Sequence, residues 1–200
     1  IVLEDQVSAE QDYVRNTPVL RTVLHAVDGS SLEIIDFCPR HAQLERTYRP
    51  LAFGRLIRPL SGTPRITIRL RPAANWGEQR AESTHGSNHI RYLCTGATFR
   101  LTTDCPVSHI VSERTFRLEK PLAFFFGPDE AYDQDVGPGV TAARDRTVAY
   151  WQQWVRKLYL PLDWQEAVIR AAITLKLCAY EETGAIVAAM TTSVPEFPES

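Results

Sequence analysis

The stretch LPLDWQEAVIRAAITLKLCAYEETG, residues 160–184, decides how the rest of the chain is interpreted. Apolar side chains recur along it at the spacing of one helical face, at Trp164, Val168, Ala171, Leu175 and Cys178. A second apolar row runs beside the first, at Ile169, Ala172, Ile173, Leu177 and Tyr180. Because little polar surface is left between these rows, the pattern predicts a helix that must be buried on most of its circumference.

Both ends of this predicted helix carry the usual signals. Asp163 is placed to act as the N-cap, and Glu166 can complete a capping box and also pair with Arg170. Gly184 supplies the stop, since glycine takes the left-handed position after a helix without steric cost. A helix over 164–182 would be about 30 Å long. The sequence offers too little other helix to cover it.

The composition is that of an ordinary globular protein of 200 residues, either one domain or one domain with an attachment. Apolar residues make up 44% and charged residues 23%, and the net charge of −2 gives no general attraction to nucleic acid or anionic membranes. No apolar run approaches the roughly eighteen residues of a membrane span. The opening residues do not resemble a secretory signal, so we expect no membrane partner.

The cysteines bear on the compartment. Cys38, Cys94, Cys105 and Cys178 are widely spread and form no C-x-x-C motif. We interpret them as buried free thiols in a reducing compartment, which predicts a cytoplasmic protein.

The first two thirds of the chain has the period of β-strands. Residues 1–17 are weakly periodic and predict an irregular or edge segment. Two strands, 19–27 and 32–37, flank Asp28-Gly29, a strong hairpin signal, and 65–71 alternates with a clear period of two. Further strands are predicted at 51–58, 89–94, 98–103, 107–111, 114–118 and 122–126. Their even spacing favours an antiparallel sandwich over βαβ units.

The pattern changes after residue 126. The segment GPDEAYDQDVGPG (127–139) is acidic and rich in glycine and proline, so we interpret it as a connector. From Thr141 the period is helical, and this helix is expected to end before Pro161. We therefore divide the chain into a β-domain (1–136), a connector with a helix (137–160) and a second helical region (161–200).

Two groups of side chains have the residue types of metal ligands. His85 and His89 lie four residues apart in THGSNH, but the residues between them indicate a turn, so we expect a hydrogen-bonded loop there. The second group is acidic and lies in the connector: Asp129, Glu130, Asp133 and Asp135. The bidentate glutamate of a calcium loop is missing, with Arg144 nearby, so we expect a solvated linker. No metal or cofactor is predicted.

The search for other chemistry gives no catalytic residue. Nine arginines lie between Arg40 and Arg80, but aromatics for base stacking are sparse there, so we expect no nucleic-acid partner. Glu181 and Glu182 are adjacent near a helix end, where their side chains diverge, and do not suit the paired carboxylates of glycoside chemistry. No nucleophile elbow or phosphate-binding glycine loop is present in the sequence.

Five segments together resemble the glucoamylase-type enzymes of glycoside hydrolase family 15, including its bacterial trehalase-like members. They are YRPLAFGRLIRPLSGTPRITIRLRP (48–72), GSNHIRYL (86–93), RLTTDCPVSHI (100–110), PLAFFFGPDE (121–130) and YWQQWVRKLYLPLDWQEAVIRAAITLKLCAYEETGAIVAAMTTSVPE (150–196). The last segment is the most specific. The resemblance implies a mainly β fold with C-terminal α structure: an antiparallel super-β-sandwich, a helical connector and the first helix of an (α/α)6 barrel. Neighbouring barrel helices, or self-association, would then cover residues 164–182.

The resemblance also implies an activity. Family members hydrolyse α-glucosidic bonds of malto-oligosaccharides, dextrins or trehalose with inversion, using one glutamic acid to protonate the leaving oxygen and another to activate water. The chain departs from the family at both ends, because it lacks the first sandwich strands and stops before the W-D-Y-R and W-x-R-D region and both catalytic glutamates. No catalytic or substrate-binding residue is carried over. We expect a catalytically silent piece of a longer enzyme.

Two other interpretations stay open. In the first, the chain is a stand-alone, non-catalytic module that binds carbohydrate or assembles with another copy. In the second, it is a degenerate family member with a structural role. A W-x-R-D segment and two barrel glutamates downstream would favour the enzyme. For the isolated chain, the exposed helix predicts self-association, aggregation or disorder, because burial of each large apolar side chain is worth about 1.5–3 kcal/mol.

Overall fold

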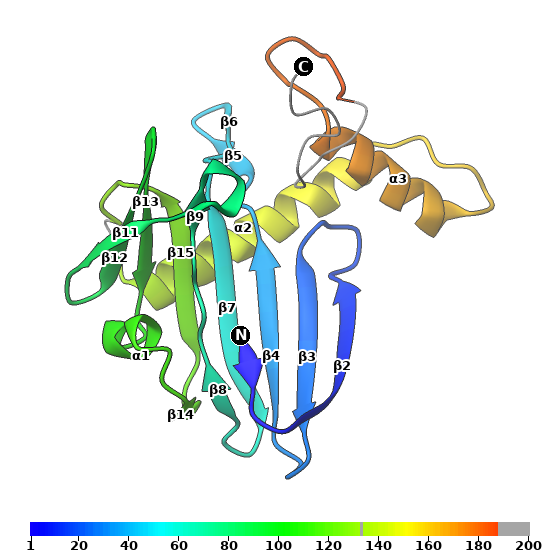
Figure 1. Cartoon of the computed structure of the whole chain (residues 1–200). Coiled ribbons are helices and arrows are strands. Elements are labelled where there is room, and N and C mark those ends of the chain that lie inside the picture. The colour runs from blue at the N-terminus through cyan, green and yellow to red at the C-terminus, as the bar shows by residue number, and fades with distance from the viewer. Residues whose placement is uncertain (133, 188–200) are drawn as a thin grey trace.

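The computed structural model describes residues 1–132 and 134–187, and it is mainly β with helices toward the C-terminal end (Figure 1). Its centre is an antiparallel sheet of eight strands in the spatial order β11-β12-β13-β15-β7-β4-β3-β2. These strands are β2 (Gln6–Tyr13), β3 (Leu20–Ala26), β4 (Ser31–Phe37), β7 (Phe53–Ser61), β11 (Glu82–His85), β12 (His89–Cys94), β13 (Ala97–Thr103) and β15 (Leu122–Pro128). The antiparallel, mainly β prediction is confirmed.

A smaller layer covers one face of this sheet. It consists of the antiparallel strands β1 (Val2–Leu3), β8 (Arg65–Thr67) and β14 (Phe116–Arg117), together with the short helix α1 (Val107–Val111). The main apolar core lies between the two layers and includes Leu32, Ile57 and Ile66, each fully buried. The sandwich therefore has very unequal sheets. The strand predicted over 65–71 pairs only along its first three residues.

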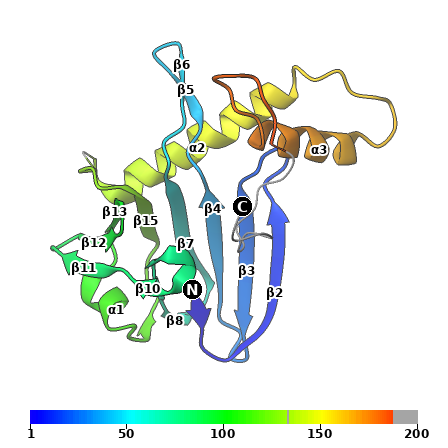
Figure 2. The same ribbon diagram turned by 45° about the horizontal axis from the view of Figure 1, so that its top comes forward.

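Short hairpins complete the β structure. β5 (His41–Gln43) and β6 (Arg46–Tyr48) form a hairpin that projects from one end of the sheet (Figure 2). β9 (Ala73–Ala74) pairs with β10 (Gln79–Arg80) around a 3-10 turn at Asn75–Gly77.

Helix α2 (Val136–Val155) crosses the opposite face of the large sheet, behind β15, β7 and β4 (Figure 1). Its buried residues recur at helical spacing, and those of its first half, from Val136 to Ala143, meet Ile35 and Phe37 in a second apolar cluster. The helix begins five residues earlier than predicted from Thr141. Pro138 is tolerated because backbone N–H groups in the first turn have no partner within a helix. The helical prediction for this segment is confirmed, and its start is corrected.

The strand predicted at 107–111 is wrong, because these residues form α1. Pro106 precedes the helix, and Val107 and Ile110, three residues apart, both point into the main core. A five-residue apolar stretch has too few positions for its period to separate helix from strand. Burial of these two side chains decides in favour of one helical turn.

Helix α3 (Gln165–Leu177) is shorter than predicted, and both of its end signals were misread. Trp164 occupies the N-cap position in a left-handed conformation with φ of 63°, and no side chain caps the helix. The capping box of Asp163 and Glu166 is therefore wrong. Gly184, with φ of 74°, lies beyond the helix in a small hairpin where Ala179 pairs with Ile186.

Much of the apolar surface of α3 faces solvent in the described part of the chain. Ile173 is its one fully buried residue, whereas Trp164 is 82% exposed, Leu175 57% and Tyr180, just beyond the helix, 62%. Residues 1–132 and 134–187 leave these side chains largely uncovered. No helix among the described residues has the length and hydropathy to cross a bilayer.

The cysteines are all unpaired, but only Cys105 is buried. Burial, with a contribution from Asp104, raises the pKa of Cys105 to about 12 and leaves its thiol protonated. Cys38 is exposed, so its expected burial is wrong. It follows β4 where the chain leaves the sheet.

Glu33 on β4 gives the sheet a pH-dependent contribution to stability. Burial acts to raise the pKa of Glu33, but hydrogen bonds from Arg58 and Arg21, each with an Nε–O distance of 2.6 Å, outweigh it and lower that pKa. A carboxylate with a lowered folded-state pKa stabilises the fold at neutral pH, and this stabilisation is lost as the pH falls through that pKa.

We predict that Glu33→Gln lowers the free energy of unfolding by about 1–3 kcal/mol at pH 7 and by less below about pH 4. Urea denaturation of both proteins across this pH range measures the difference. Glu119→Gln, at an exposed position, is the matched control. A difference that does not change with pH would contradict the role given to the Glu33 carboxylate.

Candidate functional site

The two histidines considered as metal ligands lie on the β11–β12 hairpin. His85 pairs with Ile90 across the hairpin, and the backbone N–H of Gly86 donates to the carbonyl of His89. The His89 ring lies 3.2 Å from Asn88, measured from Nδ1 to Oδ1. The predicted hydrogen-bonded turn is confirmed. Within residues 1–132 and 134–187, no three side chains of metal-ligand type come together.

The acidic connector is partly neutralised by the sheet. Asp129 accepts hydrogen bonds from the Arg91 guanidinium, with Nε–Oδ2 at 2.8 Å, and these bonds lower the pKa of Asp129. Asp135 precedes the first turn of α2 without capping it, and Glu130 lies in the loop between them. Asp133 lies outside the described residues. Among the acids of this loop that the structure describes, Asp129 is the one that forms an ion pair.

The arginine-rich segment is largely neutralised as well. Seven of its nine arginines form ion pairs: Arg40, Arg49, Arg55, Arg58, Arg65, Arg69 and Arg71. An arginine already paired with a carboxylate offers less net charge to a phosphate backbone.

Glu181 and Glu182 join the hairpin after α3 to the sandwich. Glu181 contacts Arg40 and accepts a hydrogen bond from Lys176 at 3.0 Å, and Arg49 contacts both glutamates. Burial acts to raise the pKa of Glu181, but Lys176, Arg40 and Arg49 together lower it. These carboxylates have a structural role, which sequence reasoning missed because their arginine partners lie more than 130 residues away.

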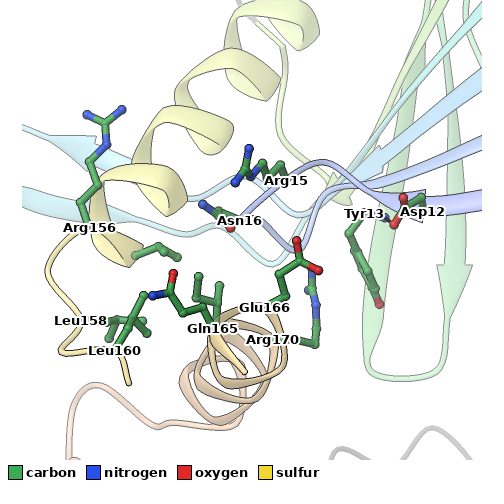
Figure 3. Close-up of a pocket in the computed structure, with 12 residues that line it drawn as sticks. Asp12, Tyr13, Arg15, Asn16, Arg156, Leu158, Leu160, Gln165, Glu166 and Arg170 are labelled. Carbon is green, nitrogen blue, oxygen red and sulfur yellow. Dashed lines mark hydrogen bonds between the residues drawn. The ribbon is translucent and has the colours of Figure 1, made fainter. Parts of the chain in front are cut away.

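A pocket of about 560 Å³ lies between the large sheet and the two long helices (Figure 3). Three segments form it: the end of β2 with the turn that follows, the C-terminal end of α2 with the loop that follows, and the first half of α3. β2 and its turn contribute Asp12, Tyr13, Arg15 and Asn16; α2 and its loop contribute Val155, Arg156, Leu158 and Leu160; α3 contributes Gln165, Glu166, Ile169 and Arg170. We refer to this site as the junction pocket.

Arg170 holds one wall of the junction pocket in place. Its Nη2 donates to the carbonyl of Thr17 at 3.0 Å, and its guanidinium lies 3.9 Å from the centre of the Tyr13 ring. Thr17 is fully buried and its hydroxyl donates to the carbonyl of Val14 at 2.8 Å, which fixes the turn. Arg170 therefore ties α3 to the edge of the sheet.

The charged side chains of the junction pocket do not neutralise one another. Asp12, Arg15, Arg156, Glu166 and Arg170 take part in no ion pair within the part of the chain that the structure describes. The predicted pairing of Glu166 with Arg170 is thus not formed. Glu166 projects from α3 toward the segment of Tyr13 to Asn16, whereas Arg156 points away from the others (Figure 3). This leaves donors and acceptors free inside a concave site.

Comparison with known proteins shows similarity to curated trehalases. The trehalase of Thermoplasma acidophilum is 25% identical over 94% of this chain and 33% of its own length, and that of Thermoplasma volcanium is 24% identical over 95% of this chain and 31% of its own. The trehalase of Mycolicibacterium smegmatis is 42% identical, but over only 27% of this chain. The chain spans about a third of the length of the first two.

No family model matches the chain, and no solved structure matches it. The likeness to trehalases is therefore one of sequence alone.

Proposed function

We propose that the chain is the sandwich part of a glycoside hydrolase that cleaves an α-glucosidic bond, and that trehalose is the first substrate to test. The observation that carries this is the similarity to two trehalases along nearly the whole chain, which spans only about a third of them. Membership of glycoside hydrolase family 15 and inversion at the anomeric carbon belong to the same proposal. The two catalytic carboxylates would lie in sequence beyond these 200 residues.

The exposed face of α3 supports this placement. Trp164, Leu175 and Tyr180 would each gain about 1.5–3 kcal/mol on burial, and they are largely exposed in the described structure. We propose that α3 is the first helix of an (α/α)6 barrel and that the remaining barrel helices cover it. In the isolated chain, self-association would take their place.

The proposal is tested by assaying glucose release from trehalose, maltose and dextrin. We expect the product of the complete reading frame to hydrolyse trehalose, with β-glucose as the first-formed anomer by NMR, and the 200-residue chain to release none. A complete protein that hydrolyses none of the three would contradict the proposal. Turnover by the 200 residues that Asp12→Asn or Glu166→Gln abolishes would move the catalytic carboxylates into the junction pocket and overturn it equally.

A stand-alone carbohydrate-binding module is the second candidate. The junction pocket favours it, because a concave site with free donors and acceptors suits a polyhydroxylated ligand without catalysis. If the complete reading frame encodes only a protein of this length, and that protein binds sugars without hydrolysing them, the module is the correct interpretation.

A further inference from the structure

We propose that the junction pocket binds one glucosyl unit of a neutral α-glucoside, with Glu166 and Asp12 accepting hydrogen bonds from the sugar hydroxyls and Arg170 donating to them. The choice of an α-glucoside rests on the proposed function, whereas the site itself rests on the geometry.

The pocket is a product of the fold and is not a local loop feature. Residues from the turn at 12–16 meet residues from 155–160 and 165–170, which lie about 140 or more positions further along the chain. The carbonyl of Arg15 accepts a hydrogen bond from Gln152 on α2 at 3.3 Å, so the turn is also tied to that helix. Its volume of about 560 Å³ falls in the range of small-molecule sites, about 300–1,000 Å³.

The polar groups suit hydroxyls, each of which both donates and accepts. The Glu166 carboxylate is an acceptor that no other side chain of the described structure bonds. Asp12 uses Oδ1 to accept the backbone N–H of Tyr13 at 2.7 Å, which leaves Oδ2 for a ligand. Arg170 has five N–H donors, of which one is bonded to Thr17, so its remaining donors are held in a fixed direction.

The charges favour a neutral ligand over an anion. Arg156 points out of the site (Figure 3), and the remaining charged residues of the lining are two arginines, Arg15 and Arg170, and two acids, Asp12 and Glu166. Carboxylates at both walls repel a phosphate or carboxylate ligand. By contrast, Arg55 and Arg91 elsewhere in the described structure are already paired with carboxylates, through hydrogen bonds to both oxygens of Asp36 and Asp129.

The apolar lining completes the match to a sugar ring. Val155, Leu158, Leu160 and Ile169 line the pocket beside the polar groups. A pyranose has C–H groups on its faces and hydroxyls at its edge, so it needs an apolar floor with polar groups at the rim.

Binding of trehalose and maltose to the purified chain, at a concentration at which light scattering shows it to be monodisperse and circular dichroism shows it to be folded, tests the proposal by calorimetry and by amide shifts in NMR. We expect saturable binding with shifts at 12–16 and 165–170. Because a hydrogen bond to a charged group is replaced, we expect Glu166→Gln to raise the Kd about tenfold and Asp12→Asn to raise it several-fold. Glu119→Gln is the control, and melting curves confirm that each variant folds.

Each other result overturns the site. The first such result is that neither disaccharide binds saturably. The second is that Glu166→Gln leaves the binding unchanged, and the third is that inorganic phosphate or glucose 6-phosphate binds in preference to the disaccharides. The proposed function fails separately. If the complete enzyme hydrolyses trehalose but the junction pocket binds no sugar, only the proposed binding site is wrong. If the pocket binds sugar but the complete protein hydrolyses none of the substrates, only the proposed enzymatic function is wrong.

Discussion

Replacing Trp151 with alanine is expected to lower the free energy of unfolding by about 3–5 kcal/mol, the range for a buried tryptophan cut back to its β-carbon. Trp151 lies on α2 with 1% of its surface exposed. It forms the centre of the apolar cluster that joins α2 to α3, with Val155 and Ile173. Its ring meets those of Tyr150 and Trp154 edge to face, with centres 5.7 and 5.6 Å apart.

The same substitution should also detach α3 before the sheet unfolds. The described contacts of α3 with the rest of the chain are few, so its order depends on this cluster. Urea denaturation followed by far-ultraviolet circular dichroism, together with amide exchange over 165–177, measures both effects. Tyr159→Ala, at a fully exposed position near the end of α2, should change stability by no more than about 0.5 kcal/mol. An equal loss in both variants would show that Trp151 does not join the helices.

Local signals predicted the sheet well. Asp28-Gly29 fixes the β3–β4 turn, where Gly29 has φ of 80° and the Asp28 carboxylate accepts the backbone N–H of Ser30 at 2.8 Å. The strand predicted at 89–94 has the same bounds as β12. Each of these features depends on side chains close together in sequence, which is why a single sequence is sufficient to find them.

The errors occur where distant contacts decide the local structure. Asp163 and Gly184 have the chemistry of helix caps, yet α3 starts after Trp164 and ends at Leu177. Beyond it, the backbone N–H of Tyr180 donates to the carbonyl of Ala185 at 2.7 Å, and this hairpin brings Glu181 to Arg40. The hairpin after α3 thus includes contacts between residues that are far apart in sequence, and local spacing does not reveal such contacts.

The junction pocket was missed for the same reason. Glu166 and Arg170 were interpreted as partners along one helix, which is the only relation that their spacing of four residues reveals. Their place beside Tyr13 and Asn16 depends on how α3 packs against the edge of the sheet. One signal was available: Asn16 precedes Thr-Pro, a turn-forming sequence, and the structure gives it φ of 60°.

Replacing Arg40 with alanine is the second large effect, with an expected loss of about 2–3 kcal/mol in the free energy of unfolding. Arg40 follows β4, and its side chain is only 11% exposed. It contacts Glu181, its Nε donates to the Tyr150 hydroxyl at 3.4 Å, and its guanidinium lies 5.3 Å from the centre of the Trp151 ring. Removing it leaves Glu181 partly buried without its nearest guanidinium.

A double-mutant cycle with Glu181→Ala separates the ion pair from the packing of Arg40 on the rings. We expect a coupling of about 1–2 kcal/mol at pH 7. The largely exposed pair of Arg65 and Glu4 is the control, with an expected coupling of about 0.5 kcal/mol or less. Because the pKa of Glu181 is lowered in the folded state, its coupling with Arg40 should hold at neutral pH and fade as the pH falls below about 4.

Ionic strength distinguishes the two pairs further. Exposed ion pairs are screened within about 10 Å at 0.1 M salt, whereas partly buried pairs are screened much less. The coupling of Arg40 with Glu181 should therefore survive 1 M salt while that of Arg65 with Glu4 vanishes. If both coupling energies vanish, the ion pairs of the hairpin contribute nothing to its attachment, and α3 is held by the apolar cluster around Trp151. If the first persists, the sandwich fixes the direction in which the chain leaves α3.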